Sequence, residues 1–379
     1  MRVARWAGVL VAVVCAVALA VAWPASPVRS AHAWLVAAVF AYTVGCGALA
    51  LLMIGYATDA VWLVVMRRPI EAVAGTLPLA AAALVPVLLS LDALYPWARV
   101  PSLPAHEAEL LRSKQAWLNE PAFVLRSIGY LAVPALLGEL LLRGSRREDR
   151  PASMRAQRVA SALGLPVLGL VTSFAMFDWL MSLEPGFYST SFGLLPNAGG
   201  FLALTGLVAV VIAIGRRGAL DAVGPEHTHA LGKVMLAALC VWAYLAFTHF
   251  LILWIADLPH EARWLLPRTT GGWKRVARAL IAFHFALPFA ALLSRELKRR
   301  AVLLALVGAL VFLVHWLELF WLALPALEPA GPTFHVADLA SLLGLCGAML
   351  ALATLRVAGL SPVPRSDPLL ARALRYRSE

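Results

Sequence analysis

The sequence predicts an all-α, polytopic integral membrane protein with about ten transmembrane helices. Of the 379 residues, 61% are hydrophobic and only 14% are charged, whereas an ordinary soluble protein carries about 25% charged residues. The mean hydropathy is +0.81. Apolar runs of about 20 residues, the length that spans the hydrocarbon core of a bilayer, recur along the chain. The apolar residues are therefore expected to face lipid and neighbouring helices.

The apolar runs divide the chain into one transmembrane domain, residues 1–357, and a basic tail, residues 358–379, which is expected to be disordered. The first run follows Arg2 and Arg5. Although Ala31-His32-Ala33 resembles a signal-peptide cleavage site, it lies well beyond this run, so a retained helix is favoured. The longest predicted outer loop is residues 91–118. The predicted spans are residues 6–23, 33–57, 72–90, 120–142, 159–181, 192–215, 231–256, 274–293, 301–324 and 334–357.

The distribution of positive charge predicts the orientation. Cytoplasmic loops of membrane proteins are enriched in Lys and Arg. With the N-terminus inside, the inner segments hold 21 of the 32 Lys and Arg residues and the outer segments hold eight. Both termini are therefore expected in the cytoplasm, and the turn after Asp178 on the outer side. The formal net charge of +11 reflects these loops, and without an aromatic-interleaved basic patch it does not indicate nucleic-acid binding.

The cysteines and histidines give little sign of a metal or a covalently attached cofactor. The four cysteines lie singly in apolar runs with no CxxC, CxxCH or iron–sulfur spacing, so they are interpreted as packing residues. His249, His284 and His315 could ligate a b-type haem between helices. No two of them share a helix at a ligand-like spacing, so core or proton-relay histidines are favoured.

Ionisable residues inside the predicted spans are the candidate functional residues, because charge in a membrane is costly and often functional. Those placed in the outer half or near the midplane are Arg126, Asp178, His249, Arg278, His284, His315, Glu318 and Asp338. Fewer candidates for an inner proton path lie near the inner ends of spans, and these are Glu139, Lys233 and Glu71. The asymmetry predicts a polar cavity that opens outward. The alternative is a set of structural ion pairs, or residues that reach the lipid headgroups.

The run Phe177-Asp178-Trp-Leu-Met-Ser-Leu-Glu184-Pro185, with the Tyr188-Ser-Thr that follows, is the most specific motif of the chain. Weaker motifs precede and follow it in order. They are Arg67-Arg-Pro-Ile-Glu71, Leu94-Tyr-Pro-Trp97, Lys114, Leu118-Asn-Glu-Pro-Ala-Phe123 with Arg126, Leu231-Gly-Lys233 with Trp242, Trp273-Lys274, His284-Phe-Ala-Leu-Pro288 and His315-Trp-Leu-Glu318.

These motifs together resemble the ten-helix membrane subunits of bacterial alternative complex III, a quinol:cytochrome c oxidoreductase. The match is closest to the second quinone-binding-type (ActF-type) subunit, which is similar to polysulfide-reductase (NrfD-like) membrane subunits. At position 318 the family is expected to favour Asp, and this chain has Glu.

The resemblance implies a subunit of a respiratory complex in the bacterial cytoplasmic (inner) membrane. Its partners would be an iron–sulfur subunit, a multihaem cytochrome c, a homologous NrfD-like membrane subunit, lipid and quinone. The iron–sulfur clusters and haem c would lie in those partners, while this chain would contribute a quinone-like cavity, a proton path, or both. Two other functions remain open from sequence: a secondary transporter with an outward-open polar cavity, and a purely structural anchor of the complex.

Overall fold

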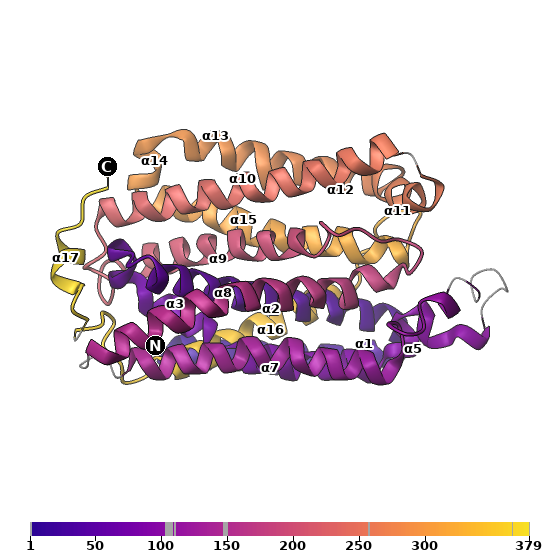
Figure 1. Cartoon of the computed structure of the whole chain (residues 1–379), viewed down its shortest axis with the longest axis horizontal. Helices are drawn as coiled ribbons and strands as arrows, with labels where there is room; N and C mark the ends of the chain where they lie inside the picture. The colour runs from indigo at the N-terminus through magenta and orange to yellow at the C-terminus, as the bar shows by residue number, and fades with distance from the viewer. Residues whose placement is uncertain are drawn as a thin grey trace.

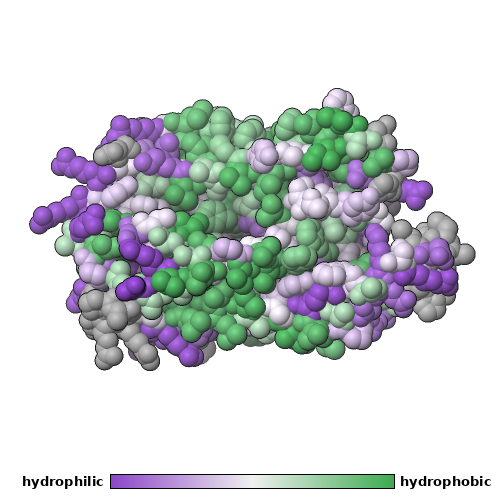
Figure 2. Space-filling view, viewed as in Figure 1, coloured by the Kyte–Doolittle hydropathy of each residue, from purple (hydrophilic) through white to green (hydrophobic). Residues whose placement is uncertain are grey.

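The computed structural model of the chain describes residues 2–102, 109, 111–146, 151–256, 258–365 and 367–378. Every regular element in these ranges is helical, and ten of the helices are long and apolar enough to cross a membrane. Figure 2 shows hydrophobic residues across the middle of the molecule and hydrophilic residues gathered at its two ends. The predicted all-α membrane fold with ten spans is confirmed.

Most helix bounds agree with the predicted spans to within four residues, but the second, fifth and seventh spans begin six to eight residues earlier than predicted, and the third begins eleven residues earlier. Eight spans are essentially continuous: α1 (Arg2–Ala25), α2 (Pro27–Ala57), α7 (Glu120–Ser145), α8 (Pro151–Trp179) with the 3-10 turn Met181–Leu183, α9 (Leu194–Gly215), α10 (Pro225–Ala256), α15 (Ala301–Ala323) with the turn Leu324–Ala326, and α16 (Val336–Arg356).

The third and eighth spans change their helical geometry along their length. The third consists of the 3-10 helix η1 (Val61–Met66), α3 (Arg67–Ala74) and α4 (Leu77–Leu88). In the eighth, the π-helical segment η4 (Leu280–Ala286) joins α12 (Trp273–Ala279) to α13 (Leu287–Leu293). Short π-helical insertions occur frequently at functional sites, and sequence gave no sign of this one.

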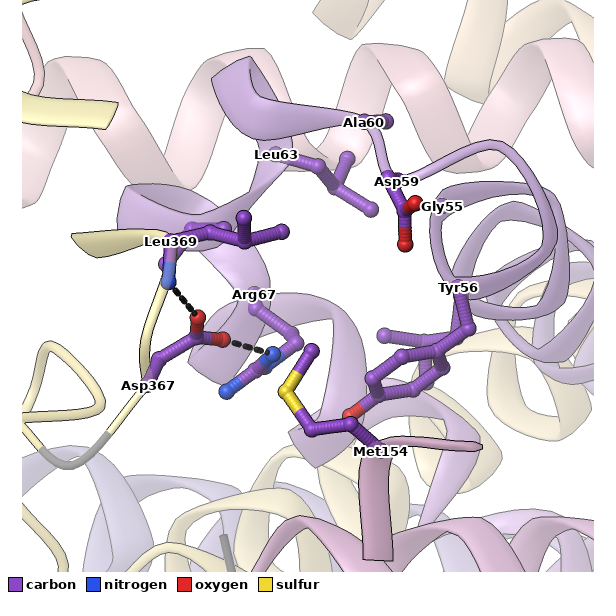
Figure 3. Close-up of a pocket in the computed structure, with 11 residues that line it drawn as sticks. Gly55, Tyr56, Asp59, Ala60, Leu63, Arg67, Met154, Asp367 and Leu369 are labelled. Carbon is purple, nitrogen blue, oxygen red and sulfur yellow. Dashed lines mark hydrogen bonds and ion pairs between the residues drawn. The ribbon is translucent and has the colours of Figure 1, made fainter. Parts of the chain in front are cut away.

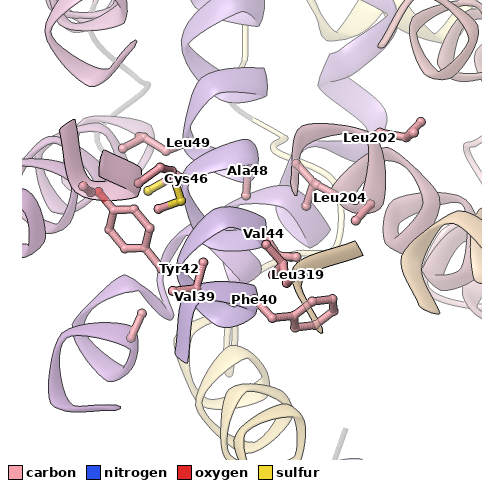
Figure 4. Packing of buried hydrophobic residues seen from close by; sticks show 14 of the residues in the cluster. Val39, Phe40, Tyr42, Val44, Cys46, Ala48, Leu49, Leu202, Leu204 and Leu319 are labelled. Atoms are coloured by element: carbon pink, nitrogen blue, oxygen red, sulfur yellow. The ribbon is translucent and has the colours of Figure 1, made fainter. Parts of the chain in front are cut away.

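Helix α2 is the centre of the bundle. Nearly all of its apolar stretch is buried, whereas the same stretch of α1 is mostly exposed. Figure 4 shows Phe40 and Val44 of α2 beside Leu319 of α15. Tyr42 points to the other side, where its hydroxyl donates to the Tyr130 carbonyl oxygen at 2.9 Å. Helices α8, α9, α15 and α16 all pack against α2, so residues on α2 can reach several spans.

Glycine pairs allow the helices to approach closely. A Cβ atom on Gly206 of α9 would lie well under 3.0 Å from the Gly308 carbonyl oxygen of α15, and the reverse is also true. Gly8 of α1 and Gly347 of α16 face each other in the same way. Small residues at helix interfaces permit such backbone contact, which drives association where lipid offers no hydrophobic gain.

The described ends of the chain lie at the same end of the bundle, together with α14 (Arg295–Arg299) and α17 (Leu370–Leu374) (Figure 1). The opposite end carries α5 (Leu91–Leu94) and α11 (Pro259–Thr269). An even number of spans requires this arrangement. We refer to the two ends as inner and outer, following the orientation that the charge distribution predicts.

The predicted outer loop, residues 91–118, is partly folded. It contains α5 and the 3-10 helix η2 (Pro96–Ser102). Tyr95 and Trp97 are buried, and the Tyr95 hydroxyl donates to the Trp179 carbonyl oxygen at 3.0 Å. Burial raises the pKa of Tyr95 well above its ordinary value, so the phenol stays neutral and keeps its proton for this bond. Residues 103–108 and 110 of the loop lie outside the described residues.

The expectation of a disordered C-terminal tail differs from the structure. Residues 358–365 and 367–378 lie across the inner end and include α17. Asp367, Ala373 and Ser378 are buried, and Asp367 forms an ion pair with Arg67 at 2.6 Å. The basic composition of the tail suggested a solvated segment, but one buried acid and a few small or apolar residues attach it to the bundle.

The glycine contact between α9 and α15 predicts a specific loss of stability. Gly206→Val should lower the free energy of unfolding by about 1–3 kcal/mol or more, because its side chain collides with backbone atoms that cannot rotate away. Gly129→Ala is the matched control, since a Cβ atom there meets nothing within 4 Å. Thermal unfolding in detergent should show a lower Tm for Gly206→Val and an equal or higher Tm for Gly129→Ala. Equal Tm values for both would contradict the contact.

Candidate functional site

Asp178 lies near the outer end of α8 and is fully buried. Arg126 of α7 binds it with two hydrogen bonds, from Nε to Oδ2 at 2.7 Å and from Nη2 to Oδ1 at 3.1 Å. The Tyr130 hydroxyl donates to Oδ2 at 2.9 Å, and the Trp117 indole N–H donates to Oδ1 at 2.8 Å. Four donors, from α7 and the segment just before it, therefore surround the carboxylate, and Arg126 places an opposite charge beside it.

A cavity of about 250 Å³ lies at the outer end, immediately next to this pair. Its walls come from residues 113–118 and from the run that begins at Phe177. The aromatic side chains that line it are Trp117, Phe177, Phe187 and Tyr188. Trp117 and Tyr188 are also exposed, so the cavity reaches the surface of the bundle.

Lys114 provides the positive charge of this outer cavity. Its ammonium donates to the Pro185 carbonyl oxygen at 2.6 Å and lies 5.5 Å from the centre of the Tyr188 ring. Burial lowers the pKa of Lys114 from its ordinary value. On the far side of the Trp117 ring, the Arg126 guanidinium stacks at 4.1 Å from the ring centre. The indole thus joins the cavity to the Asp178–Arg126 pair.

A second polar cluster lies in the middle of the bundle, where α2, α10, α15 and η4 meet. His315 Nδ1 and Glu318 Oε2 are 2.8 Å apart, and the Trp242 indole N–H donates to Glu318 Oε1 at 2.6 Å. The Thr43 hydroxyl lies 3.0 Å from His315 Nε2. His284, in the π-helical segment, contacts Trp242 with ring centres 4.2 Å apart and ring planes tilted by 38°.

The hydrogen bonds of this central cluster allow more than one arrangement of protons. The Thr43 hydroxyl lies within hydrogen-bonding distance of the Val39 carbonyl oxygen, at 2.9 Å, and of His315. It carries one proton and can donate to only one of them. If Thr43 donates to His315, Nε2 of that ring carries no proton. If Thr43 donates to Val39 instead, Nε2 keeps its contact with the hydroxyl only as a donor, so the His315–Glu318 pair then holds one more proton. The geometry therefore allows this pair to take up or release a proton without moving heavy atoms.

Gly199 of α9 makes room for the pair. A Cβ atom there would lie well under 3.0 Å from both Glu318 Oε2 and His315 Nδ1. His284 is fully buried, and neither of its ring nitrogens makes a well-formed hydrogen bond with the described residues. A buried imidazole in this state can bind a small polar molecule.

His249 lies in an aromatic enclosure at the outer end. Ser189 and Ser191 are each 3.3 Å from its Nδ1, and the Trp264 ring meets it edge-on at 5.2 Å. Its buried Nε2 has no hydrogen-bond partner among the described residues.

Glu184, later in the same run as Asp178, binds α11. Arg268 of α11 binds Glu184 Oε1 at 2.5 Å and the Leu322 carbonyl oxygen at 2.7 Å. Burial lowers the pKa of Arg268 from its ordinary value, and Glu184 offsets part of that shift by favouring the charged form.

Asp338 and Arg278 do not join these clusters. Asp338 accepts two hydrogen bonds from Arg29, at 2.7 and 2.6 Å, and caps the start of α16. Arg278 is exposed on the outside of the bundle. The outer-half candidates are thus brought together in separate sets of contacts, and the described residues do not form one cavity lined by all eight.

The inner candidates also have distinct surroundings. Glu71 is buried and binds Arg68 at 2.7 Å and the Ser145 hydroxyl at 2.5 Å. Glu139 is shared between Arg143 and Arg356, each at 3.1 Å. Lys233 is exposed.

Sequence reasoning overlooked several residues that complete these clusters. They are Arg29, Thr43, Trp117, Tyr130 and Gly199. Threonine, tryptophan and glycine are ordinary in membrane helices, so their types carry no signal. Arg29 and Trp117 lie between predicted spans. An Arg just before a predicted span can reach an acid at the same depth, and this position is the signal that could have identified Arg29. No group of three side chains suited to a metal ion occurs among the described residues.

Comparison with models of known protein families finds no match, and comparison with curated proteins finds no significant match.

The Asp178–Arg126 pair predicts a large coupling energy. Asp178→Leu or Arg126→Leu alone should each destabilise the protein by about 3–5 kcal/mol, because each leaves a buried charge without its partner. The double variant should lose much less than the sum of the two. Denaturant unfolding of the four proteins measures the cycle. Strictly additive losses would show that the two charges do not stabilise each other.

Proposed function

We propose that the chain is a membrane subunit of a respiratory quinol-oxidising electron-transfer complex, of the alternative complex III kind, in the bacterial inner membrane. The order of its motifs along ten spans supports this proposal. The chain offers no cysteine spacing for an iron–sulfur cluster or covalently attached haem, so electrons would pass through an iron–sulfur subunit and a multihaem cytochrome c.

The observation that carries the proposal is the outer cavity built on the Asp178 run. A quinol head is a planar ring with two oxygens, attached to an apolar tail that lies in lipid. An engineered cavity of about 150 Å³ binds benzene, so a cavity of about 250 Å³ has room for a substituted ring. Trp117 and Tyr188 offer faces for stacking, and Lys114 offers a donor to a ring oxygen.

Asp178 then has a positioning role. Its two oxygens already accept four hydrogen bonds, and Arg126 balances its charge. The hydrogen bond from Trp117 fixes that ring at the cavity wall. The groups with freedom to exchange protons are His315 and Glu318 in the middle of the bundle. We assign them to a proton path.

A secondary transporter is the second candidate. The observation that favours it is the change of helical geometry within the third and eighth spans, because transporters place binding sites at interrupted helices. In a transporter the central cluster around His315 and Glu318 would be the substrate-binding site, and the protein would act without redox partners.

Purification from native membranes distinguishes the subunit of a respiratory complex from the secondary transporter. An affinity-tagged chain should co-purify with haem c and iron–sulfur absorbance and with quinol:cytochrome c reductase activity. Isolation of the tagged chain alone, under detergent conditions that keep control respiratory complexes intact, would contradict the proposal that the chain belongs to such a complex.

Variants of the outer cavity should weaken quinol binding. Lys114→Gln removes the cationic donor and Tyr188→Leu removes a stacking face. Each should raise the KM for quinol about tenfold with a smaller change in kcat, as expected for roughly 1–2 kcal/mol of lost ground-state binding. Steady-state kinetics of the purified complex measure the effect.

Matched controls lie outside the cavity. Lys274→Gln removes an exposed lysine at the same end of the bundle, and Trp254→Leu removes an exposed aromatic residue of α10. Both should leave KM unchanged. If the cavity variants assemble normally and their KM for quinol is unchanged, the outer cavity is not the quinol-binding site.

A further inference from the structure

The C-terminal segment, residues 358–365 and 367–378, lies across the inner end of the bundle and is called here the C-terminal strap. Its first attachment is Asp367. One carboxylate oxygen accepts from Arg67 Nη1 at 2.6 Å, and the other accepts from the Leu369 backbone N–H at 2.7 Å. Both side chains of the ion pair are almost fully buried, so the strap is held by a charge pair protected from solvent.

The second attachment is at the start of α10. His227 Nε2 lies 2.9 Å from the Ala373 carbonyl oxygen, and its ring lies 5.6 Å from the Tyr376 ring. His229 Nδ1 lies 3.0 Å from the Ser378 hydroxyl. The Ser378 backbone N–H donates to Glu226 at 3.2 Å. The strap thus bridges the third and seventh spans, which are far apart in sequence.

A small cavity of about 20 Å³ lies beneath the first attachment. Figure 3 shows Asp367 and Leu369 of the strap on one side of it, and on the other side Tyr56, at the inner end of α2, and Asp59, in the turn that follows. This volume accommodates about one water molecule. The strap forms part of the wall of this partly enclosed cavity, so its removal would widen the opening to the inner aqueous phase.

The backbone next to this cavity is irregular. Asp59 has a φ of 49°, a left-handed conformation that is uncommon for a residue other than glycine. The following helix, η1, has 3-10 geometry over six residues, and 3-10 stretches of that length are uncommon and often mark a hinge. Asp59 is also paired with Arg158 of α8. The strap therefore rests on an irregular part of the transmembrane domain, against η1.

We propose that the C-terminal strap is a closure for the inner mouth of the bundle. When closed, it limits the space between α2, η1 and α8 to about one water molecule; when released, bulk water reaches Leu63, Tyr56 and Arg67. The outward face of the strap is solvated, since Arg372, Arg375 and Arg377 are exposed. It makes few contacts compared with a span, so its local opening costs less than global unfolding. This device is independent of the proposed quinol site.

Thiol accessibility tests the closure in the full chain. A cysteine introduced by Leu63→Cys reports on the cavity, because Leu63 is buried and lines it. Modification by a small membrane-impermeant maleimide is followed at that site by mass spectrometry. Removal of residues 358–379 should speed modification at least tenfold, and Asp367→Ala should act in the same direction.

Two comparisons keep the test independent of misfolding. Leu304→Cys reports on a buried position near the inner end of α15 that does not line the cavity, and its modification rate should not change. His227→Phe, which removes only the second attachment, should give an intermediate rate at position 63. Unchanged modification at position 63 after strap removal would overturn the proposal, and so would an equal increase at positions 63 and 304.

Discussion

The cost of placing charge in a low-dielectric layer determines how the polar residues of this protein are arranged. A buried charge without a partner destabilises a protein strongly, while a paired and hydrogen-bonded one is tolerated. Asp178 meets Arg126, Asp338 meets Arg29, and Glu71 meets Arg68, each at less than 3 Å. The partners come from separate helices in the first two cases. These pairs therefore fix how the helices are rotated and displaced relative to one another.

Close helix packing makes the central cluster possible. His315 and Glu318 can lie against α9 only because Gly199 has no side chain. The neighbouring contacts of Gly206 with Gly308 bring α9 and α15 together at backbone distance. Within this frame, the π-helical turn of the eighth span places His284 on the Trp242 ring. The polar cluster in the middle of the bundle thus depends on glycines, which carry no polar group.

The positions of the spans could be predicted from sequence because they depend on the length and hydropathy of continuous runs. The depth of Asp178, His315 and Glu318 followed from helix rise. Which of these residues meet could not be predicted, because side-chain direction depends on helix rotation and on breaks such as η4. Grouping Asp338 and Arg278 with the others assumed that equal depth means proximity. The strap shows the same limit, since its packing depends on the buried acid Asp367 and on contacts of Ala373 and Ser378 that composition does not indicate.

In the proposed function, the outer cavity would bind quinol and the central cluster would transfer protons. Asp178 would act through Trp117, which donates to it and has Arg126 over its ring. Lys114 and Tyr188 would form the polar and aromatic sides of the quinol-ring site. The strap lies at the opposite end of the bundle (Figure 1). Ring binding and inner water access would therefore be controlled by separate parts of the chain.

The most direct test of the quinol cavity is photoaffinity labelling of the purified complex with a quinone that carries a photoreactive group on its ring. We predict covalent modification within residues 113–118 or 177–188. Excess unlabelled quinol should suppress it, and Tyr188→Leu should reduce it. Labelling confined to other segments of the chain or to partner subunits, or labelling that excess quinol does not compete away, would contradict the account.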